Sequence, residues 1–214
     1  MKTRPILFST PMVQALLDGS KGMTRRILKS QPEGCQLISR DACSPSGYSF
    51  IADMYDDEYI KCPYGKAGDL LWVRETWRPS VDGEVSCSEY KTGEFVPIEN
   101  TPEAADAWIE SRKAVEQYPI LKPPVWRPSI FMRRWASRIT LEITDICIER
   151  LKDISEEDCV SEGIKKLQGG AMVEFKTLWE SINGKDSWWD NPWVWVVKFN
   201  VHRCNIDDFA GRKK

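Results

Sequence analysis

The chain has 214 residues, a hydrophobic fraction of 42% and ten tryptophans, which together predict a folded protein with one domain over residues 1–214. A net charge of −2 provides no overall basic field, and no apolar run is long enough to span a membrane, so we expect a cytoplasmic protein without a membrane partner. The single histidine, His202, argues against a zinc deaminase, whose motif combines His-x-Glu with Pro-Cys-x-x-Cys.

The first predicted elements lead to a loop that carries basic residues. Residues 4–8 alternate weakly and predict a short strand, and residues 10–11 are Thr-Pro, a typical helix start with a threonine cap and proline at the first helical position. Gly19 is the natural end of that helix. We therefore expect Lys21 and Thr24 to lie on the loop that follows it.

The central part of the chain predicts short strands and an insertion. Strands are expected around 26–28 and 48–51, and residues 70–75 form a run of strong β formers after a Gly-Asp turn. Residues 79–124 begin and end in proline-rich segments and are interpreted as an insertion. Within it, residues 103–118 predict a helix.

Strands and helices alternate in the last third of the chain. Residues 137–148 alternate apolar and polar side chains, as a half-buried strand does. Ser155 is predicted to cap a short acidic helix that ends at Gly163. Residues 171–182 are amphipathic with helical spacing, and residues 193–201 predict a final strand. This order predicts an α+β fold built on a small, mostly antiparallel β-barrel with short flanking helices.

The seven cysteines have no spacing typical of a metal site. No Cys-x-x-Cys pair occurs, and Cys35, Cys43, Cys62 and Cys87 are more widely separated than the ligands of known zinc sites. We expect free thiols in a reducing cytosol. The sequence predicts neither a metal nor a cofactor.

Lys21 and Thr24 are the residues best suited to chemistry. A lysine can activate a neighbouring threonine as a nucleophile without any histidine, provided that the lysine is neutral. Arg25 and Arg26 follow directly and offer planar cations for a phosphate or a polar base. The alternative interpretation of such residues after a helix is a solvated turn.

A second group of residues interleaves aromatic rings with arginines. Trp126 lies near Arg133 and Arg134, and Arg74 and Glu75 precede another tryptophan. Such interleaving suits base stacking combined with phosphate contact. Cation–π packing at the protein surface is the alternative for each pair.

Four segments of the chain have the order and residue types of a known family. They are Gly19-Ser20-Lys21-Gly22-Met23-Thr24-x-Arg26, Lys66-Ala67-Gly68-Asp69-Leu70-Leu71-Trp72-Val73, Leu151-x-x-Ile154-Ser155-x-x-Asp158-x-x-x-Glu162-Gly163 and Trp195-Val196-Val197-Lys198-Phe199. These segments resemble the ASCH family, a branch of the PUA-like β-barrels.

The chain is most similar to the ASCH-like proteins carried by phages and prophages. The further segments of that resemblance are Arg4-Pro5-Ile6-Leu7-Phe8-Ser9, Trp72-Val73-Arg74-Glu75-Thr76-Trp77 and Trp126-Arg127-Pro128-Ser129-Ile130. With them the similarity spans nearly the whole chain, and the insertion at 79–124 departs from the smaller family members.

The resemblance implies a nucleic-acid or modified-nucleoside ligand. One small ASCH enzyme removes the acetyl group from 4-acetylcytidine with a lysine base, a threonine nucleophile and a glutamate proton donor, which correspond to Lys21, Thr24 and Glu162. Independently of the resemblance, the candidate binding residues from the sequence pattern are Arg25, Arg26, Arg74, Glu75, Trp126, Arg133 and Arg134. Other ASCH proteins are thought to bind or cut RNA. A non-catalytic RNA- or DNA-binding module, a ribonuclease and a phage adaptor that binds a host protein therefore stay open, as does the oligomeric state.

Overall fold

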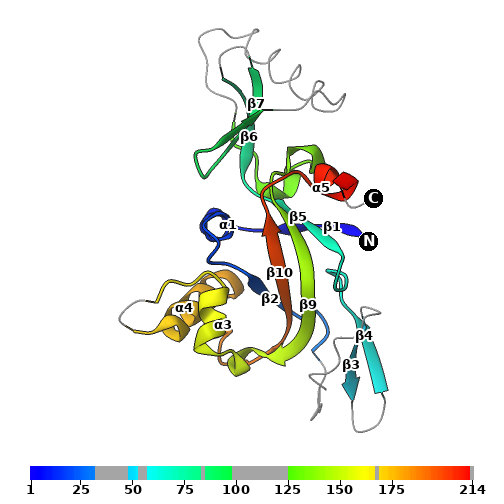
Figure 1. The fold of residues 1–214 in the computed structure, drawn as a ribbon. Helices are drawn as coiled ribbons and strands as arrows, with labels where there is room; N and C mark the ends of the chain where they lie inside the picture. The colour runs from blue at the N-terminus through cyan, green and yellow to red at the C-terminus, as the bar shows by residue number, and fades with distance from the viewer. Residues whose placement is uncertain (32–47, 53–56, 83–84, 98–124, 167–168, 213–214) are drawn as a thin grey trace. The chain divides into compact units, whose positions relative to one another are not determined.

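The structure is a computed structural model that describes residues 1–31, 48–52, 57–82, 85–97, 125–166 and 169–212 (Figure 1). The helix predicted at 103–118 lies outside these residues, as does the end of the predicted insertion at 79–124. None of the helices in the described ranges is long and apolar enough to cross a membrane.

Strands and helices are both present, which confirms the α+β class. The strands are β1 (Thr3–Leu7), β2 (Met23–Ile27), β3 (Tyr48–Ala52), β4 (Asp57–Lys61), β5 (Leu70–Arg74), β6 (Trp77–Asp82), β7 (Val85–Tyr90), β8 (Phe95–Pro97), β9 (Thr140–Arg150) and β10 (Trp193–His202). The helices are α1 (Thr10–Leu17), α3 (Glu156–Ser161), α4 (Ala171–Asn183) and α5 (Ile206–Arg212), with short 3-10 turns η1 (Ser129–Phe131), η2 (Arg134–Ala136) and η3 (Leu151–Asp153).

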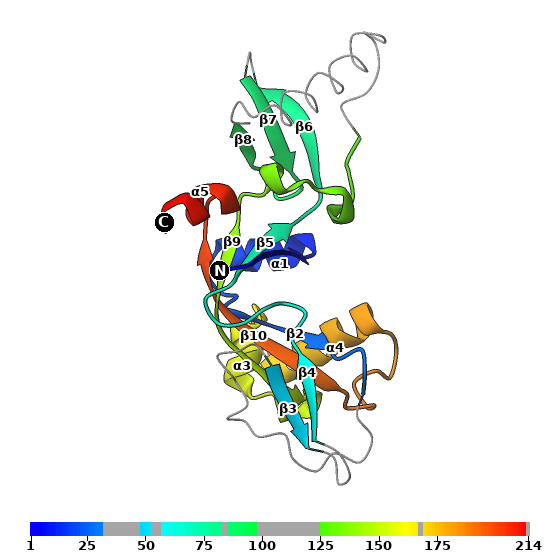
Figure 2. The same ribbon diagram turned by 90° about the vertical axis from the view of Figure 1, so that its right-hand side faces the viewer.

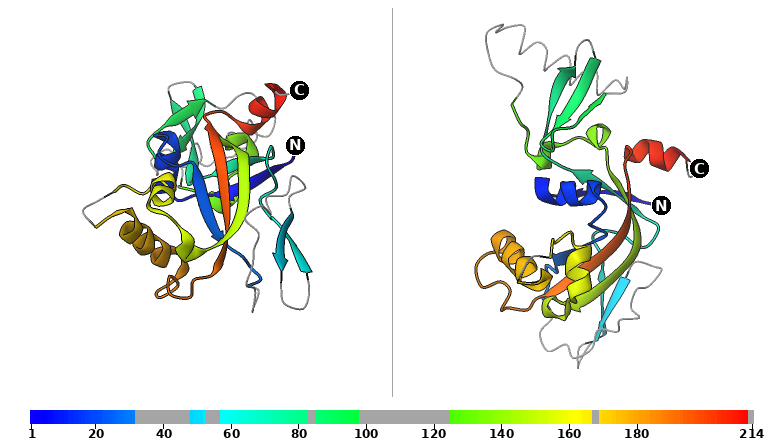
Figure 3. Two further views of the ribbon diagram at one scale, coloured as in Figure 1. Left: turned by 60° about the horizontal axis from the view of Figure 1, so that its bottom comes forward. Right: turned by 60° about the vertical axis from the view of Figure 1, so that its left-hand side comes forward.

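Five strands form one sheet in the order β1-β5-β9-β10-β2 (Figure 3). β10 and β2 are antiparallel. β1 and β5 are parallel, because Leu70 N donates to Lys2 O and Phe8 N donates to Arg74 O. In the described residues this sheet is open, with β1 and β2 at its edges, so the predicted closure into a barrel is not confirmed.

Contacts divide the chain into two compact units. Unit 1 comprises residues 1–2, 15–70 and 142–201, and unit 2 comprises residues 3–14, 71–141 and 202–214. The division passes through β5 and β9. The polar cluster described below lies in unit 1 and the pocket described below lies in unit 2.

The core of unit 1 forms where α3 and α4 cover one face of β2 and β10. Phe175 and Trp179 of α4 are buried one helical turn apart, and they belong to the same apolar cluster as Met23 of β2 and Val196 of β10. The amphipathic helix predicted at 171–182 is therefore confirmed. Burial of its apolar face fixes the position of α3 beside β2.

Caps define both ends of α3. Ser155 Oγ accepts a hydrogen bond from Asp158 N at 3.1 Å, as the sequence predicted. Glu162 is the C-cap residue, and Gly163 follows with φ +86°. A Cβ atom at Gly163 would lie 2.7 Å from Cβ of Ala15 and 3.2 Å from Cβ of Lys21, so only glycine fits there. This close approach brings the end of α3 against the loop that carries Lys21.

Two sequence predictions need correction. Met23–Ile27 forms β2, so Thr24 lies in a strand that begins earlier than predicted. The pairing with β10 decides this, because Thr24 lies opposite Val197. In addition, β6, β7 and β8 form a three-stranded antiparallel sheet in a region where only a helix was predicted (Figure 2). Buried Trp77 and Tyr90 anchor that sheet in the core of unit 2.

Candidate functional site

Backbone contacts bring Lys21 beside Glu162. Lys21 N donates to Ala15 O at 3.0 Å, and Gly22 N donates to Ser161 O at 2.8 Å. Lys21 and Glu162 also form an isolated antiparallel bridge. The loop after α1 is thereby joined to the end of α3.

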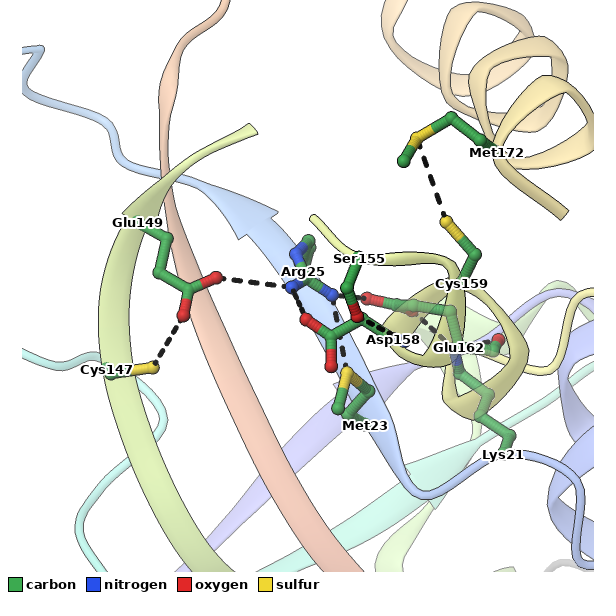
Figure 4. Close-up of polar contacts among 10 residues, drawn as sticks. All are labelled: Lys21, Met23, Arg25, Cys147, Glu149, Ser155, Asp158, Cys159, Glu162 and Met172. Carbon is green, nitrogen blue, oxygen red and sulfur yellow. Dashed lines mark hydrogen bonds and ion pairs between the residues drawn. The ribbon is translucent and has the colours of Figure 1, made fainter. Parts of the chain in front are cut away.

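The side chains of this pair form a buried ion pair (Figure 4). Lys21 Nζ donates to Glu162 Oε2 at 2.8 Å and to the Glu162 main-chain oxygen at 2.7 Å, although 141 residues separate the two positions. Only 2% of Lys21 and 4% of Glu162 is exposed. The ammonium group therefore satisfies a carbonyl at the C-terminus of α3, where the helix dipole favours a cation.

Arg25 extends the pair into a larger network. Its Nη2 atom lies 2.6 Å from Asp158 Oδ2 and 3.2 Å from Glu149 Oε2, and its Nη1 atom lies 3.5 Å from Glu162 Oε1. Burial lowers the pKa of Arg25, but the carboxylates of Glu162, Asp158 and Glu149 outweigh burial and raise it. We call Lys21, Arg25, Glu149, Asp158 and Glu162 the Lys21 cluster. It joins β2, α3 and β9.

Lys21 differs from Arg25 in its electrostatic balance. Burial lowers the pKa of Lys21, and the attraction of Glu162 opposes this shift without cancelling it. A lysine with a lowered pKa has a larger unprotonated fraction near neutral pH, and that fraction can act as a general base.

Thr24 lies on the opposite side of β2 from Arg25. Arg25 is opposite Val196, which packs beneath α3 and α4, whereas Thr24 is opposite Val197. Successive strand residues point to opposite faces, so Thr24 and Arg26 share the other face. Thr24 is buried. The structure thus joins Lys21 to Glu162 through a recorded contact and does not join Thr24 to them.

Glu75 belongs to a second buried ion pair, in unit 2. Arg138 donates from Nε and Nη2 to the two carboxylate oxygens of Glu75, each at 2.9 Å, and also pairs with Glu94. Burial raises the pKa of Glu75 even though Arg138 opposes the shift. The guanidinium stacks 4.1 Å from the ring centroid of Tyr90. Glu75 is therefore occupied by a protein partner, and Arg138 was missed because its partner is distant in sequence.

Two other predicted binding residues also contact protein groups. Arg134 pairs with Asp207 at 2.6 Å and donates to Thr3 Oγ1 at 2.6 Å. The ring of Trp126 lies 4.5 Å from the Arg78 guanidinium and 4.4 Å from Lys91 Nζ. These contacts favour the surface-packing interpretation of both residues.

Two further predicted arginines, Arg74 and Arg133, meet in one pocket of unit 2. The pocket has a volume of about 500 Å³ and is lined by Arg74, Arg127, Ile130, Phe131, Met132 and Arg133. We call these six residues the arginine pocket. No carboxylate is among them, and none of the three arginines forms an ion pair with an acidic residue of the described chain. Arg127 was among the arginines interleaved with tryptophans in the sequence, whereas Ile130 and Phe131 were not predicted as site residues.

Arg74 shows the consequence of the missing carboxylate. Burial lowers the pKa of its guanidinium, and no acidic group offsets the shift. Its Nε atom is buried without a hydrogen-bond partner. Its Nη2 donates to the Ile130 main-chain oxygen, and the group lies 5.4 Å from the Trp72 ring centroid. A buried donor without a partner in the protein can donate to a water molecule or to an acceptor of a ligand.

No group of three or more His, Cys, Asp or Glu side chains within the described ranges is arranged to hold a metal ion. Cys62, Cys147, Cys159 and Cys204 are not in disulfide bonds. Cys35 and Cys43 lie outside the described residues. Comparison with models of known families, with curated proteins and with solved structures finds no match to this chain.

Proposed function

We propose that this chain recognises RNA, DNA or a modified nucleoside, and that the arginine pocket holds a phosphate of that ligand. The observation that carries the proposal is the meeting of Arg74, Arg127 and Arg133 in one pocket without a lining carboxylate. Membership of the ASCH family, with a PUA-like and mostly antiparallel barrel, is part of the same proposal. It rests on the sequence motifs and on the antiparallel pairing of β2 with β10.

The chemistry of the lining supports a phosphate ligand. Guanidinium groups are planar, permanently charged donors that match phosphate oxygens in pairs. A volume of about 500 Å³ lies within the range of sites for small molecules, so a nucleotide unit fits its size. The net charge of −2 does not oppose this, because a local cationic pocket acts at short range in physiological salt.

Oligonucleotide binding tests the proposal. Arg133 is exposed, so its replacement removes a charge without disturbing the core. Arg133→Ala should weaken binding of labelled oligonucleotides by a similar factor for all sequences, as expected of a phosphate contact. Arg203→Ala, at an exposed arginine outside the pocket, is the matched control and should bind as the wild type does. Equal affinity of wild type and Arg133→Ala for every oligonucleotide would contradict the proposal.

Acyl-amide hydrolysis is the second candidate, and the Lys21–Glu162 contact favours it. The ammonium–carboxylate pair contains the same number of protons as a neutral amine beside a carboxylic acid. In the second form Lys21 Nζ accepts the hydroxyl proton of Thr24, whose oxygen attacks the acetyl carbonyl of 4-acetylcytidine. The C–N bond breaks as Glu162 protonates the departing N4 amine. Water then hydrolyses the acyl-threonine ester to acetate. This sequence requires Thr24 to approach Lys21 from the other face of β2.

Acetate release from 4-acetylcytidine tests the second candidate. Thr24→Ala should abolish release, and Thr24→Ser should retain part of the rate because it keeps the hydroxyl. Lys21→Arg should be inactive, since a guanidinium stays protonated. Wild-type activity should rise with pH through the lowered pKa of Lys21. A wild-type protein that leaves 4-acetylcytidine intact at high concentration would rule out this substrate.

A further inference from the structure

The turn η1 holds two apolar side chains in solvent at the edge of the arginine pocket. Ile130 is 54% exposed and Phe131 is 61% exposed, although both are large and adjacent in sequence. Both line the same pocket as the three arginines. Adjacent exposed apolar residues beside a cationic pocket are typical of a surface that contacts a ligand with apolar and anionic parts.

Hydrogen bonds and a buried neighbour hold the turn in place, so Ile130 and Phe131 stay exposed. Phe131 N donates to Pro128 O at 3.0 Å, and Met132 N donates to Ser129 O at 3.1 Å. Arg74 holds the main-chain oxygen of Ile130. Met132 is 1% exposed and belongs to the core of unit 2. Because the neighbours are anchored, Phe131 cannot turn inward without disrupting the turn.

Phe131 takes the place of the tryptophans that the sequence suggested as stacking residues. Trp77 is fully buried and meets Trp135 edge to face at 5.4 Å. Trp126 lies beneath Arg78 and Lys91. Among the residues that line the arginine pocket, Phe131 is the aromatic one.

We infer that the arginine pocket binds single-stranded nucleic acid, with a base stacked on Phe131 and the adjoining phosphate held by Arg74, Arg127 and Arg133. The inference rests on the proposed nucleic-acid function and narrows it to one form of ligand. A base in a single strand can present its face to an aromatic ring, whereas bases inside a duplex are already stacked on each other. Phosphate contact alone would not distinguish the two forms.

The test compares single strands with duplexes of the same length by fluorescence anisotropy. Wild-type protein should bind labelled oligothymidylate or oligouridylate more tightly than a duplex. Phe131→Ala should weaken single-strand binding on the order of 10- to 100-fold, the loss that corresponds to one stacked base. The slope of log affinity against log salt should stay unchanged, because no cation is removed. Phe131→Trp should restore the affinity.

The control is Ile182→Ala, at a side chain that is 62% exposed on α4 of unit 1, and it should not change binding. Thermal unfolding of each variant confirms that it is folded. Duplex binding as tight as single-strand binding, or unchanged single-strand affinity in Phe131→Ala, would overturn the inference while Arg133→Ala still tests the phosphate contact. Absence of binding to any oligonucleotide would instead contradict the proposed function itself.

Discussion

The Lys21 cluster and the arginine pocket both contain arginines beside an apolar core, but only the first is neutralised by the protein. Arg25 has carboxylates at 2.6 Å and 3.2 Å, and their attraction raises its pKa. Arg74 has no such partner among the residues that the structure describes, and burial lowers its pKa. The difference indicates that Arg25 stabilises the junction of β2 with α3, whereas Arg74 is suited to an anion from outside.

The predicted binding residues also differ in whether an oppositely charged residue of the protein neutralises them. Arg25, Glu75 and Arg134 are each held by an oppositely charged residue of the same unit. Arg133 is exposed and has no acidic partner in the described part of the chain. A cation that already pairs with a carboxylate gains less from a phosphate, because binding must first break the existing pair.

The largest effect is expected at Glu162. Glu162→Gln removes the carboxylate that lies 2.8 Å from Lys21 Nζ and leaves that buried ammonium poorly compensated. We expect a loss of about 3–5 kcal/mol in the free energy of unfolding, measured by urea denaturation. Glu157→Gln, at an exposed carboxylate of the same helix, should have little effect. A small loss at Glu162 would show that the cluster does not stabilise unit 1.

Arg138→Met should destabilise unit 2 by about 3 kcal/mol near neutral pH, because it leaves Glu75 buried without its guanidinium partner. The loss should shrink toward acid. The pKa of Glu75 is higher in the folded protein than in the unfolded chain. The protonated carboxyl group therefore stabilises the fold fully below the unfolded pKa of about 4.3, and this contribution to the free energy of unfolding is lost as the pH rises through the pKa of the folded protein. Removing Arg138 raises the folded pKa further and makes the loss greatest at neutral pH.

Urea unfolding at about pH 4 and near neutral pH measures this dependence. Arg134→Met is the matched control, because its partner Asp207 has a side chain that is 61% exposed. A surface pair of this kind contributes little, so the control should change stability slightly at both pH values. An Arg138→Met loss that is the same at both pH values would contradict the assignment to Glu75.

Gly163→Ala should lower the free energy of unfolding by about 1–3 kcal/mol, because alanine is strained in the left-handed backbone conformation of Gly163. A close contact of the added Cβ atom should increase this loss. The added Cβ would lie 2.7 Å from Cβ of Ala15. Gly19→Ala separates the two effects, since Gly19 has φ +81° and nothing within 4 Å of a Cβ. In thermal and urea unfolding, Gly163→Ala should be clearly less stable than Gly19→Ala. Equal stabilities would show that the loop of Lys21 does not pack tightly against the end of α3.

Features set by neighbouring residues could be predicted from the sequence. Ser155 caps α3 and Gly163 ends it because both roles depend on local backbone geometry. The helix at 171–182 follows from its apolar spacing. Lys21 was chosen for its chemistry beside Thr24 and Glu162 through the family resemblance, and no local pattern indicates that the two touch.

Features set by distant partners could not be predicted. Met23–Ile27 contains Thr24, Arg25 and Arg26 and has no apolar alternation, so its strand depends on pairing with β10. Asp158 lies 133 residues from Arg25, and Asp207 lies 73 residues from Arg134. The sequence showed which residues were basic, but it did not show which of them the fold would neutralise.

The salt dependence of oligonucleotide binding tests the contrast between the two regions most directly. Each phosphate contact contributes about 0.7–1 to the slope of log affinity against log salt. We predict that Arg133→Ala lowers the slope by that amount and that Arg134→Ala and Arg203→Ala leave it unchanged. A slope that is the same in wild type and Arg133→Ala, or that falls equally in Arg134→Ala, would contradict the account.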